Sequence, residues 1–462
     1  MLSGDKTGLL KTFLGSLPGD LAQRLASAVE VDRMMDGKAL PHEVILDGLR
    51  PVLRQGGRGL RTPTPLRLFC LPFEDLLFSG ARTKKQKAVV CRGSVLPVWL
   101  WVSRTLMPEH AQAFVADVKA LIVAGKLPEA AARASQFWTF AGNKIRETLA
   151  DDAQRKVARE LLKDASILAD AEEIALLLLA GADVLKIQTI LAKPVPQLNE
   201  ELLWQLRAVY DELIERNPDA APYVAVIAMN RLAKPWEALR LPMMICRQTQ
   251  DTLISKTDMG LVGEILLTRL DDLQKAIMAT RHPMFEAEAL IVQVQGFAEL
   301  SSAVVKEIEV RRDGEWGQRL LKDRSAVGGV MDSFMDRAPK ELAASLPMQK
   351  SSGPKMSDFS RLPDPDKQTL GMRYTRLVVG CRNFAAAGSF GAKQKTNFED
   401  MCGYLRRHNE DLVKELRGSD PVRRANAEAQ FEYCAELTRL LFSEEEAELL
   451  RRRGRAAQSA AA

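Results

Sequence analysis

The residues best suited to chemistry in this sequence are the basic side chains crowded between positions 50 and 108. Eleven lysines and arginines stand there against two acids, Glu74 and Asp75, which gives the segment a net charge of +9. The whole chain carries only +5, so the remainder is slightly acidic at −4. Flexible bases can follow the phosphates of a nucleic acid or the carboxylates of an acidic protein. We take as candidate polyanion-binding or partner-binding residues Arg54, Arg58, Arg61, Arg67, Lys84, Lys85, Lys87 and Arg92.

Five aromatic residues are interleaved with these bases and allow more than one interpretation. In a nucleic-acid interface, some of the rings would stack on bases. In the interpretation that we favour, the rings anchor a proline-rich segment to helices, and the arginines face solvent or pair with acids elsewhere in the chain. A third interpretation gives the basic surface an acidic protein partner. The five rings are Phe69, Phe73, Phe78, Trp99 and Trp101.

Signatures of catalysis, cofactor binding or metal binding are not found in the sequence. None of the four histidines belongs to an E-x-x-H or H-x-x-x-H pattern, which helical metal sites use. His408 and Glu410 match the H-x-E of zinc deaminases, but no P-C-x-x-C accompanies them. No glycine-rich phosphate loop and no G-x-S-x-G elbow occurs. We therefore expect no catalytic residue, no cofactor and no metal, and the sequence leans away from an enzyme.

The six cysteines are far apart and form no C-x-x-C pair, which favours reduced thiols over a disulfide framework or a zinc knuckle. Cys70 and Cys91 lie among the bases, which would favour their thiolate forms. Neither has an assignable histidine partner, so we expect both to behave as small apolar residues.

The elements that must position the basic segment are mostly helices. Residues 1–55 predict a helical pair, in which the second helix stops near Pro51. Residues 56–107 predict a basic, Pro/Gly-rich, irregular and partly extended insert, because its prolines prevent a long helix. Residues 108–346 predict an irregular array of helices.

Local capping patterns mark several helix starts within the array and beyond it. Asn199 is predicted to cap one helix, and Asp170 with Glu173 makes a cap pattern ahead of the apolar run 174–182. Residues 347–368 are rich in proline, serine and glycine and predict a linker that is too polar to pack. Residues 369–462 predict a small C-terminal helical bundle, with caps at Asn397, Asp420 and Ser443.

Composition places the chain among globular proteins. It has 462 residues, of which 46% are hydrophobic and 27% are charged. The longest apolar run is too short to cross a bilayer, and no signal-peptide core is evident, so we expect a cytoplasmic protein without a transmembrane segment. The sequence predicts an all-α fold and a non-enzymatic interaction protein, an adaptor or scaffold with a protein partner. The alternative is a nucleic-acid-associated factor that binds RNA or single-stranded DNA through residues 54–104.

Overall fold

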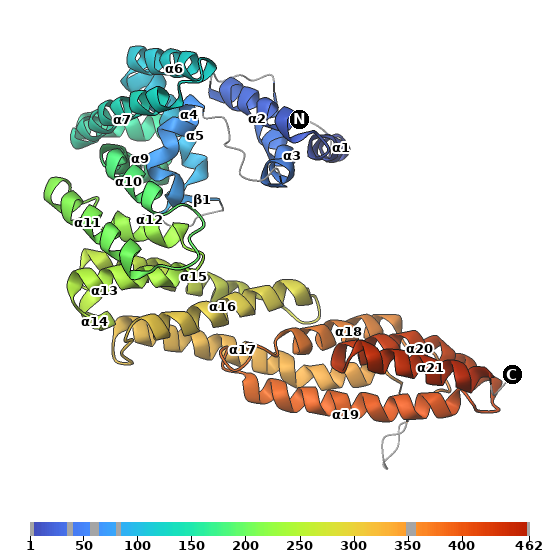
Figure 1. Cartoon of the computed structure of the whole chain (residues 1–462). Helices are drawn as coiled ribbons and strands as arrows, with labels where there is room; N and C mark the ends of the chain where they lie inside the picture. Colours follow the sequence, from blue (N-terminus) through green and yellow to red (C-terminus); the bar gives the residue numbers. More distant parts are fainter. Residues whose placement is uncertain (1–3, 35–39, 56–63, 80–84, 348–356, 460–462) are drawn as a thin grey trace. The chain divides into compact units, whose positions relative to one another are not determined.

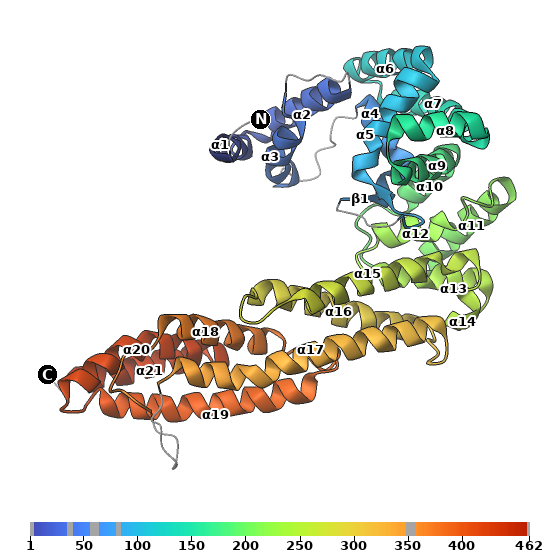
Figure 2. The same ribbon diagram turned by 180° about the vertical axis from the view of Figure 1, so that it is seen from behind.

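The computed structural model describes residues 4–34, 40–55, 64–79, 85–347 and 357–459. Helices dominate these ranges, and the only strands within them are two of two residues each (Figures 1 and 2). The prediction of an all-α, irregular multi-helix array is therefore confirmed. No helix in these ranges is both long enough and apolar enough to span a membrane. The chain divides into two compact units, residues 1–245 and 246–462. This division falls inside the predicted 108–346 array, and the five-part organisation of the sequence stays a prediction.

The first unit begins with three helices that enclose a small core of their own. They are α1 (Gly4–Gly15), α2 (Gly19–Met34) and α3 (His42–Gln55). Their shared core consists of Leu14, Ala22, Ala26, Val29, Ile45 and Leu49. Helix α3 continues past Pro51, where the sequence predicted an end. Because Pro51 is exposed, water can hydrate the Asp47 carbonyl that loses its backbone donor there, so the helix tolerates the ring.

The predicted irregular insert consists of short elements. In chain order they are α4 (Pro65–Cys70), the 3-10 helix η1 (Leu71–Leu76), strands β1 (Leu77–Phe78) and β2 (Val90–Cys91), α5 (Arg92–Trp101) and the π-helical turn η2 (Val102–Leu106). The two strands pair in parallel, with Leu77 opposite Val90. The described part of the insert thus contains one short strand pair among short helices, and Pro97 lies inside α5 without ending it.

The rest of the first unit is helical. Its elements are α6 (Pro108–Val123), α7 (Leu127–Ala150), α8 (Asp152–Leu162), α9 (Ala165–Leu179), α10 (Gly181–Ile190), α11 (Glu200–Arg216), α12 (Tyr223–Arg231), η3 (Pro235–Leu239) and α13 (Arg240–Cys246). Asn199 caps α11 as predicted, its side chain accepting from the Leu202 amide. The predicted cap at Asp170 is wrong, because α9 begins a turn and a half earlier and Asp164 caps it.

The second unit contains longer helices. They are α14 (Asp251–Ile254), η4 (Asp258–Gly260), α15 (Leu261–Ala279), α16 (Ala287–Glu307), α17 (Glu315–Ser345), α18 (Pro365–Gly380), α19 (Gly391–Glu415), α20 (Pro421–Leu441) and α21 (Glu444–Ser459). Helices α15 and α17 approach closely at Gly263, where an added Cβ would lie 2.0 Å from the Trp316 ring. Only glycine fits that position.

Helices α17 to α21 pack against one another at the C-terminal end of the chain (Figures 1 and 2). The predicted cap at Asp420 is confirmed, since its carboxylate accepts from the Val422 and Arg423 amides. The Ser443 hydroxyl accepts from the Glu446 amide, again as predicted. Asn397 is not a cap, because α19 starts six residues earlier, at Gly391.

Part of the predicted linker packs into this bundle. Ser357 and Asp358 are buried and Phe359 is only 1% exposed, although we expected this polar segment not to pack. The Asn426 amide holds this segment by donating to the Phe359 carbonyl at 3.0 Å. Burial of the Phe359 ring and this hydrogen bond therefore hold residues 357–359 against the bundle, although the segment is polar overall.

Candidate functional site

The aromatic residues of the insert lie mainly in the core of the first unit. Phe69 and Phe73 are fully buried, Trp99 is 1% exposed and Trp101 is 5% exposed. The Trp99 ring lies 5.0 Å from Phe69 and packs against rings on α6 and α7. Of the five rings, Phe78 alone is largely open to solvent, at 44% exposure. Four of the five are therefore unavailable to stack on nucleic-acid bases.

Arg67 connects the insert to the N-terminal helices. Its guanidinium forms a two-point contact with Glu30 of α2, at 3.0 Å from Nε to Oε2 and 3.2 Å from Nη2 to Oε1. Thr64 caps α4 by accepting from the Arg67 amide, which fixes the start of the helix that carries Arg67. This candidate residue therefore binds an acid of its own chain.

Lys85 is at the centre of a buried polar cluster, which we call the lysine–carboxylate cluster: Lys85, Asp170, Glu173, Ser94 and Tyr223. The Lys85 ammonium donates to Asp170 Oδ1 at 2.7 Å, to the Val89 carbonyl at 2.7 Å, and to Glu173. Asp170 is fully buried and Glu173 is 7% exposed. The two acids are three residues apart on α9, so they share one helix face.

The remaining carboxylate oxygens of the cluster are also bonded. Asp170 Oδ2 accepts from the Ser94 hydroxyl at 2.6 Å and from the Cys91 amide at 3.1 Å, which places a negative charge at the N-terminus of α5. Glu173 Oε1 accepts from the Ala88 amide and from the Tyr223 hydroxyl, both at 2.5 Å. Burial, with the Glu173 charge, raises the pKa of Tyr223 far above its usual range. Tyr223 therefore stays a donor.

This geometry makes the cluster an anchor for residues 85–94. Every carboxylate oxygen has a partner, and the ammonium has three acceptors. A general base needs an accessible lone pair within reach of a substrate proton, and the cluster offers none. What it supplies is a fixed path for residues 85–94, including Ala88, which adopts a φ of 62°.

The other candidate bases have different surroundings. Lys87 and Arg92 are exposed, and the Arg92 Nε donates to the Ser79 hydroxyl at 2.9 Å. Arg58, Arg61 and Lys84 lie outside the described residues, as does the side chain of Arg54. Among the eight candidates, the structure therefore brings Arg67 and Lys85 into internal ion pairs and leaves Lys87 and Arg92 facing solvent.

Sequence reasoning found Lys85 but missed its partners. Asp170 and Glu173 were interpreted as a helix cap because their i, i+3 spacing is that of a capping box. The same spacing puts two carboxylates side by side on the face of a helix interior. The apolar run after Glu173 was the available signal, because it indicated a helix buried on most sides, where acids need partners.

The Cys70 thiol is not activated. Burial, supported by the Glu74 charge, raises the pKa of Cys70 far above its usual range, and the opposing effects of Arg33 and Arg92 are smaller. The bases were expected to favour a thiolate, but desolvation outweighs them.

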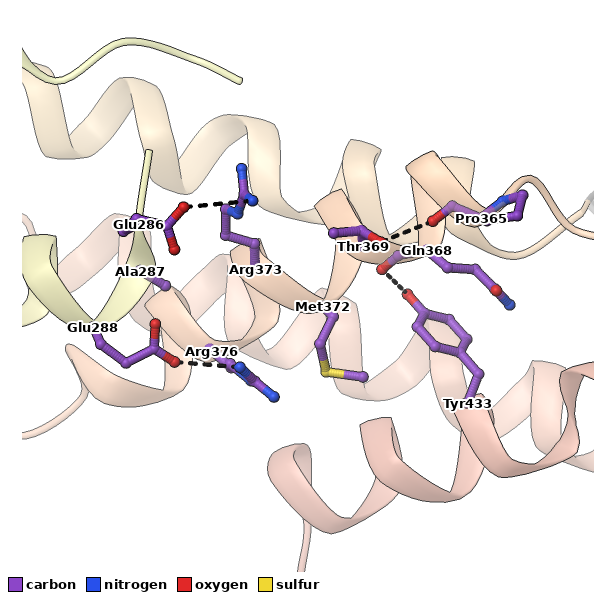
Figure 3. Close-up of a pocket in the computed structure, with 10 residues that line it drawn as sticks. All are labelled: Glu286, Ala287, Glu288, Pro365, Gln368, Thr369, Met372, Arg373, Arg376 and Tyr433. Carbon is purple, nitrogen blue, oxygen red and sulfur yellow. Dashed lines mark hydrogen bonds and ion pairs between the residues drawn. The ribbon is translucent and has the colours of Figure 1, made fainter. Parts of the chain in front are cut away.

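The second unit contains a pocket of about 490 Å³ between the start of α16, α18 and α20 (Figure 3). Two arginines of α18 line it, and each faces an acid: Arg376 lies 3.3 Å from Glu288, and Arg373 lies 3.7 Å from Glu286. At the other end, the Tyr433 hydroxyl donates to the Gln368 carbonyl at 3.0 Å. The charges of these four side chains balance. No local pattern in the sequence indicates this pocket, because its residues come from three separate helices.

The second unit also contains a serine, a histidine and an aspartate in contact. Ser357 Oγ lies 2.9 Å from His408 Nδ1 and 3.0 Å from Asp411 Oδ2. In a hydrolase triad the carboxylate would bond the histidine, whereas here it bonds the serine. Ser357 is 6% exposed and His408 is 2% exposed, so no substrate reaches them. Burial lowers the pKa of His408 to about 4, which keeps the ring neutral. These three residues hold residues 357–359 on α19.

No cluster of three or more potential ligands in the described part of the chain could hold a metal ion. Comparison of the chain with family models, with curated proteins and with solved structures gives no match in any of the three.

Proposed function

We propose that this chain is a non-enzymatic helical interaction protein of the cytoplasm, an adaptor or scaffold that binds a protein partner. The observation that carries the proposal is Trp204 on α11, which is 64% exposed. Tryptophan is among the largest apolar side chains and is highly buried on average in folded proteins. It is also enriched among the residues that dominate the binding energy of protein interfaces.

Helix α8 supports the same proposal. Val157 and Leu161 are 55% and 52% exposed and lie one turn apart, while Ala158 and Leu162 pack inward. The helix therefore has an outward apolar stripe in addition to its buried one. Contiguous exposed apolar patches mark protein interaction sites, and Val157 and Leu161 form a small one.

The alternative, a factor that binds RNA or single-stranded DNA through residues 54–104, has less support. Arg67 and Lys85 bond to acids of their own chain, which leaves Lys87 and Arg92 as the exposed candidates within the described ranges. Within the described ranges, the exposed candidates therefore supply at most two phosphate contacts, each worth roughly 0.7 of a unit of salt slope on a single strand.

The proposal is tested by isolating the chain from its native source. We expect at least one protein to co-purify with the wild-type chain in a fixed ratio, and to be lost with Trp204→Ala. Leu449→Ala is the matched control, because Leu449 is also an exposed apolar residue, at 55%, but lies in the second unit. The 260 to 280 nm absorbance ratio reports bound nucleic acid. Recovery of the chain alone, or with nucleic acid only, would contradict the proposal.

A further inference from the structure

Helix α11 has one face that the described part of the chain leaves exposed. Residues Glu200, Trp204, Ala208, Asp211 and Glu215 follow at intervals of four, four, three and four, which places them on one side of an α-helix. All five are exposed, and we call them the α11 face. The helix packs against α10 and α12, and its other side carries its buried residues Leu206, Val209, Tyr210 and Leu213.

The α11 face carries an exposed tryptophan with two acids beside it. Trp204 is 64% exposed. Glu200 and Glu201 precede it by four and three residues, and side chains at these spacings are neighbours on a helix surface, with Cβ atoms about 5–6 Å apart. Both acids are exposed as well. A cation that contacts the Trp204 ring therefore also lies near two carboxylates.

The charges of α11 leave this surface negative. The helix contains five acids and two arginines, which gives it a net charge of −3. Both arginines bind acids, since Arg207 Nε lies 2.8 Å from Asp211 Oδ1, and Arg216 Nη2 lies 2.7 Å from Asp183 Oδ1. By contrast, no ion pair within the described ranges involves Glu200, Glu201 or Glu215. Three carboxylates of the helix thus remain for a partner.

The stability of the helix explains only part of this arrangement. Acids in the first turn favour a helix through its dipole, which accounts for Glu200 and Glu201. Glu215 is in the last turn, where the dipole disfavours an acid. The exposed part of the Trp204 ring adds nothing to the core. Neither Glu215 nor the exposure of Trp204 is accounted for by the stability of the free helix.

We propose that the α11 face is the docking site for a basic, arginine-containing segment of a protein partner, with a guanidinium of the partner on the Trp204 ring. Tryptophan is the best ring for such a cation–π contact, and arginine forms it more often than lysine. The neighbouring carboxylates can accept from the N–H groups of the same segment. The inference rests on the proposed function, because it names the kind of segment that Trp204 binds.

The size and the charge of the α11 face fit such a segment. From Glu200 to Glu215 the helix rises about 22 Å, which about seven residues of an extended chain span. The phosphates of a nucleic acid or of an anionic lipid surface would be repelled by the carboxylates. A purely apolar segment would cover the ring but would leave the acids beside it desolvated and unpaired. A basic protein segment serves both the ring and the acids.

The test uses the full chain and a labelled peptide of about nine residues in which arginine alternates with glycine, a flexible sequence that can follow the helix. Fluorescence anisotropy measures its dissociation constant. We expect Trp204→Ala to raise this constant about tenfold or more, because tryptophan is common among the residues that dominate interfaces. Trp204→Leu keeps an apolar side chain without a π face and should lose nearly as much affinity. Circular dichroism of each variant verifies its fold.

The role of the carboxylates is tested separately. Glu200→Gln with Glu215→Gln should raise the dissociation constant at least about threefold and weaken its dependence on salt, because salt screens charged pairs. Glu109→Gln with Glu147→Gln is the matched control, with less than a twofold change expected. Glu109 is in the first turn of α6 and Glu147 in the last turn of α7, and both are exposed, so their positions match those of Glu200 and Glu215.

Five outcomes would overturn the inference. The first is no peptide binding by the wild-type chain, and the second is wild-type affinity in Trp204→Leu, which would indicate an apolar anchor. The third is an equal effect of the two glutamate pairs, which would mean that total charge alone is responsible. The fourth is tighter binding of an oligothymidylate of about 16 nucleotides. The fifth is self-association in sedimentation that is lost with Trp204→Ala, which would assign the α11 face to a second copy of the chain.

The outcome is separate from that of the proposed function. If native partners are lost with Trp204→Ala but the arginine peptide does not bind the wild-type chain, the adaptor role stands and the basic occupant is wrong. If the peptide binds as expected but no protein co-purifies from the native source, the α11 face recognises basic segments and the proposed function fails.

Discussion

Two segments are held on a helix by buried polar groups, residues 85–94 in the first unit and 357–359 in the second, but the chemistry differs. In the first, two carboxylates and an ammonium are charged and every carboxylate oxygen is bonded. In the second, a neutral histidine lies 2.9 Å from a serine hydroxyl. Buried charge is tolerated where several donors converge, and a site with fewer partners keeps its titratable ring neutral.

The largest expected effect follows from removing one acid of the lysine–carboxylate cluster. Asp170→Ala leaves Lys85, the Ser94 hydroxyl and the Cys91 amide without their acceptor in a buried site. Breaking a buried ion pair in this way costs about 3–5 kcal/mol of unfolding free energy. Chemical denaturation measures the loss, and faster hydrogen exchange of amides 85–94 locates it.

The matched control for this prediction is Glu172→Ala on the same helix. Glu172 is exposed and pairs with Arg155 at the surface, so its removal should cost less than about 1 kcal/mol. Equal losses for the two variants would show that the cluster is no stronger than a surface pair, and the contrast between the two segments would disappear.

These two segments also show what sequence can and cannot predict. Caps such as Asn199 and Asp420 were found because the donor and acceptor are two or three residues apart. The partners of Lys85 lie 85 and 88 residues away, and only packing brings them together. Phe359 was overlooked because the composition of the surrounding segment is polar. The all-α class of the fold was predictable, because helices show themselves in the local periodicity of apolar residues.

The basic insert illustrates the same limit. The sequence directed attention to the dense basic and aromatic insert, whose rings prove to be mostly core. Density along the chain is a poor guide to an exposed surface in a helical protein, because neighbouring residues point to different sides.

The second prediction concerns the neutral histidine. Burial depresses the folded pKa of His408 to about 4 from an ordinary 6.5. Between these values the unfolded chain binds more protons than the folded one, so the stabilising contribution is complete above pH 6.5 and is lost as the pH falls through 4. The loss reaches about 3 kcal/mol at pH 4. The test measures the unfolding free energies of the wild-type chain and of His408→Gln from pH 7 to pH 4. The difference between the two should change by about that amount relative to its value at pH 7.

His110→Gln is the control for the pH series, because His110 is exposed on α6. Its profile should follow that of the wild-type chain. The acids of the protein also titrate in this range, and comparing variants removes their shared contribution. Parallel profiles for wild-type chain and His408→Gln would mean that His408 titrates normally, and the second segment would then be held by something other than a neutral ring.

The smallest expected effect concerns the outer side of residues 85–94, where Lys87 and Arg92 face solvent while Lys85 points inward. Replacing both exposed bases by alanine should change the unfolding free energy by less than about 0.5 kcal/mol.

The same double variant tests RNA binding. If Lys87 and Arg92 contact phosphates, binding to single-stranded RNA should weaken and its salt slope should fall by about 1.4, at roughly 0.7 for each base. Under the adaptor proposal, RNA binding stays in the 100 μM class of non-specific contacts. Lys144→Ala with Lys156→Ala, two exposed lysines of the same unit, should then give the same slope as the Lys87→Ala, Arg92→Ala variant. The nucleic-acid alternative would be restored by micromolar RNA binding whose salt slope falls in the Lys87→Ala, Arg92→Ala variant but not in this control. The inner face of residues 85–94 would then be structural and the outer face functional.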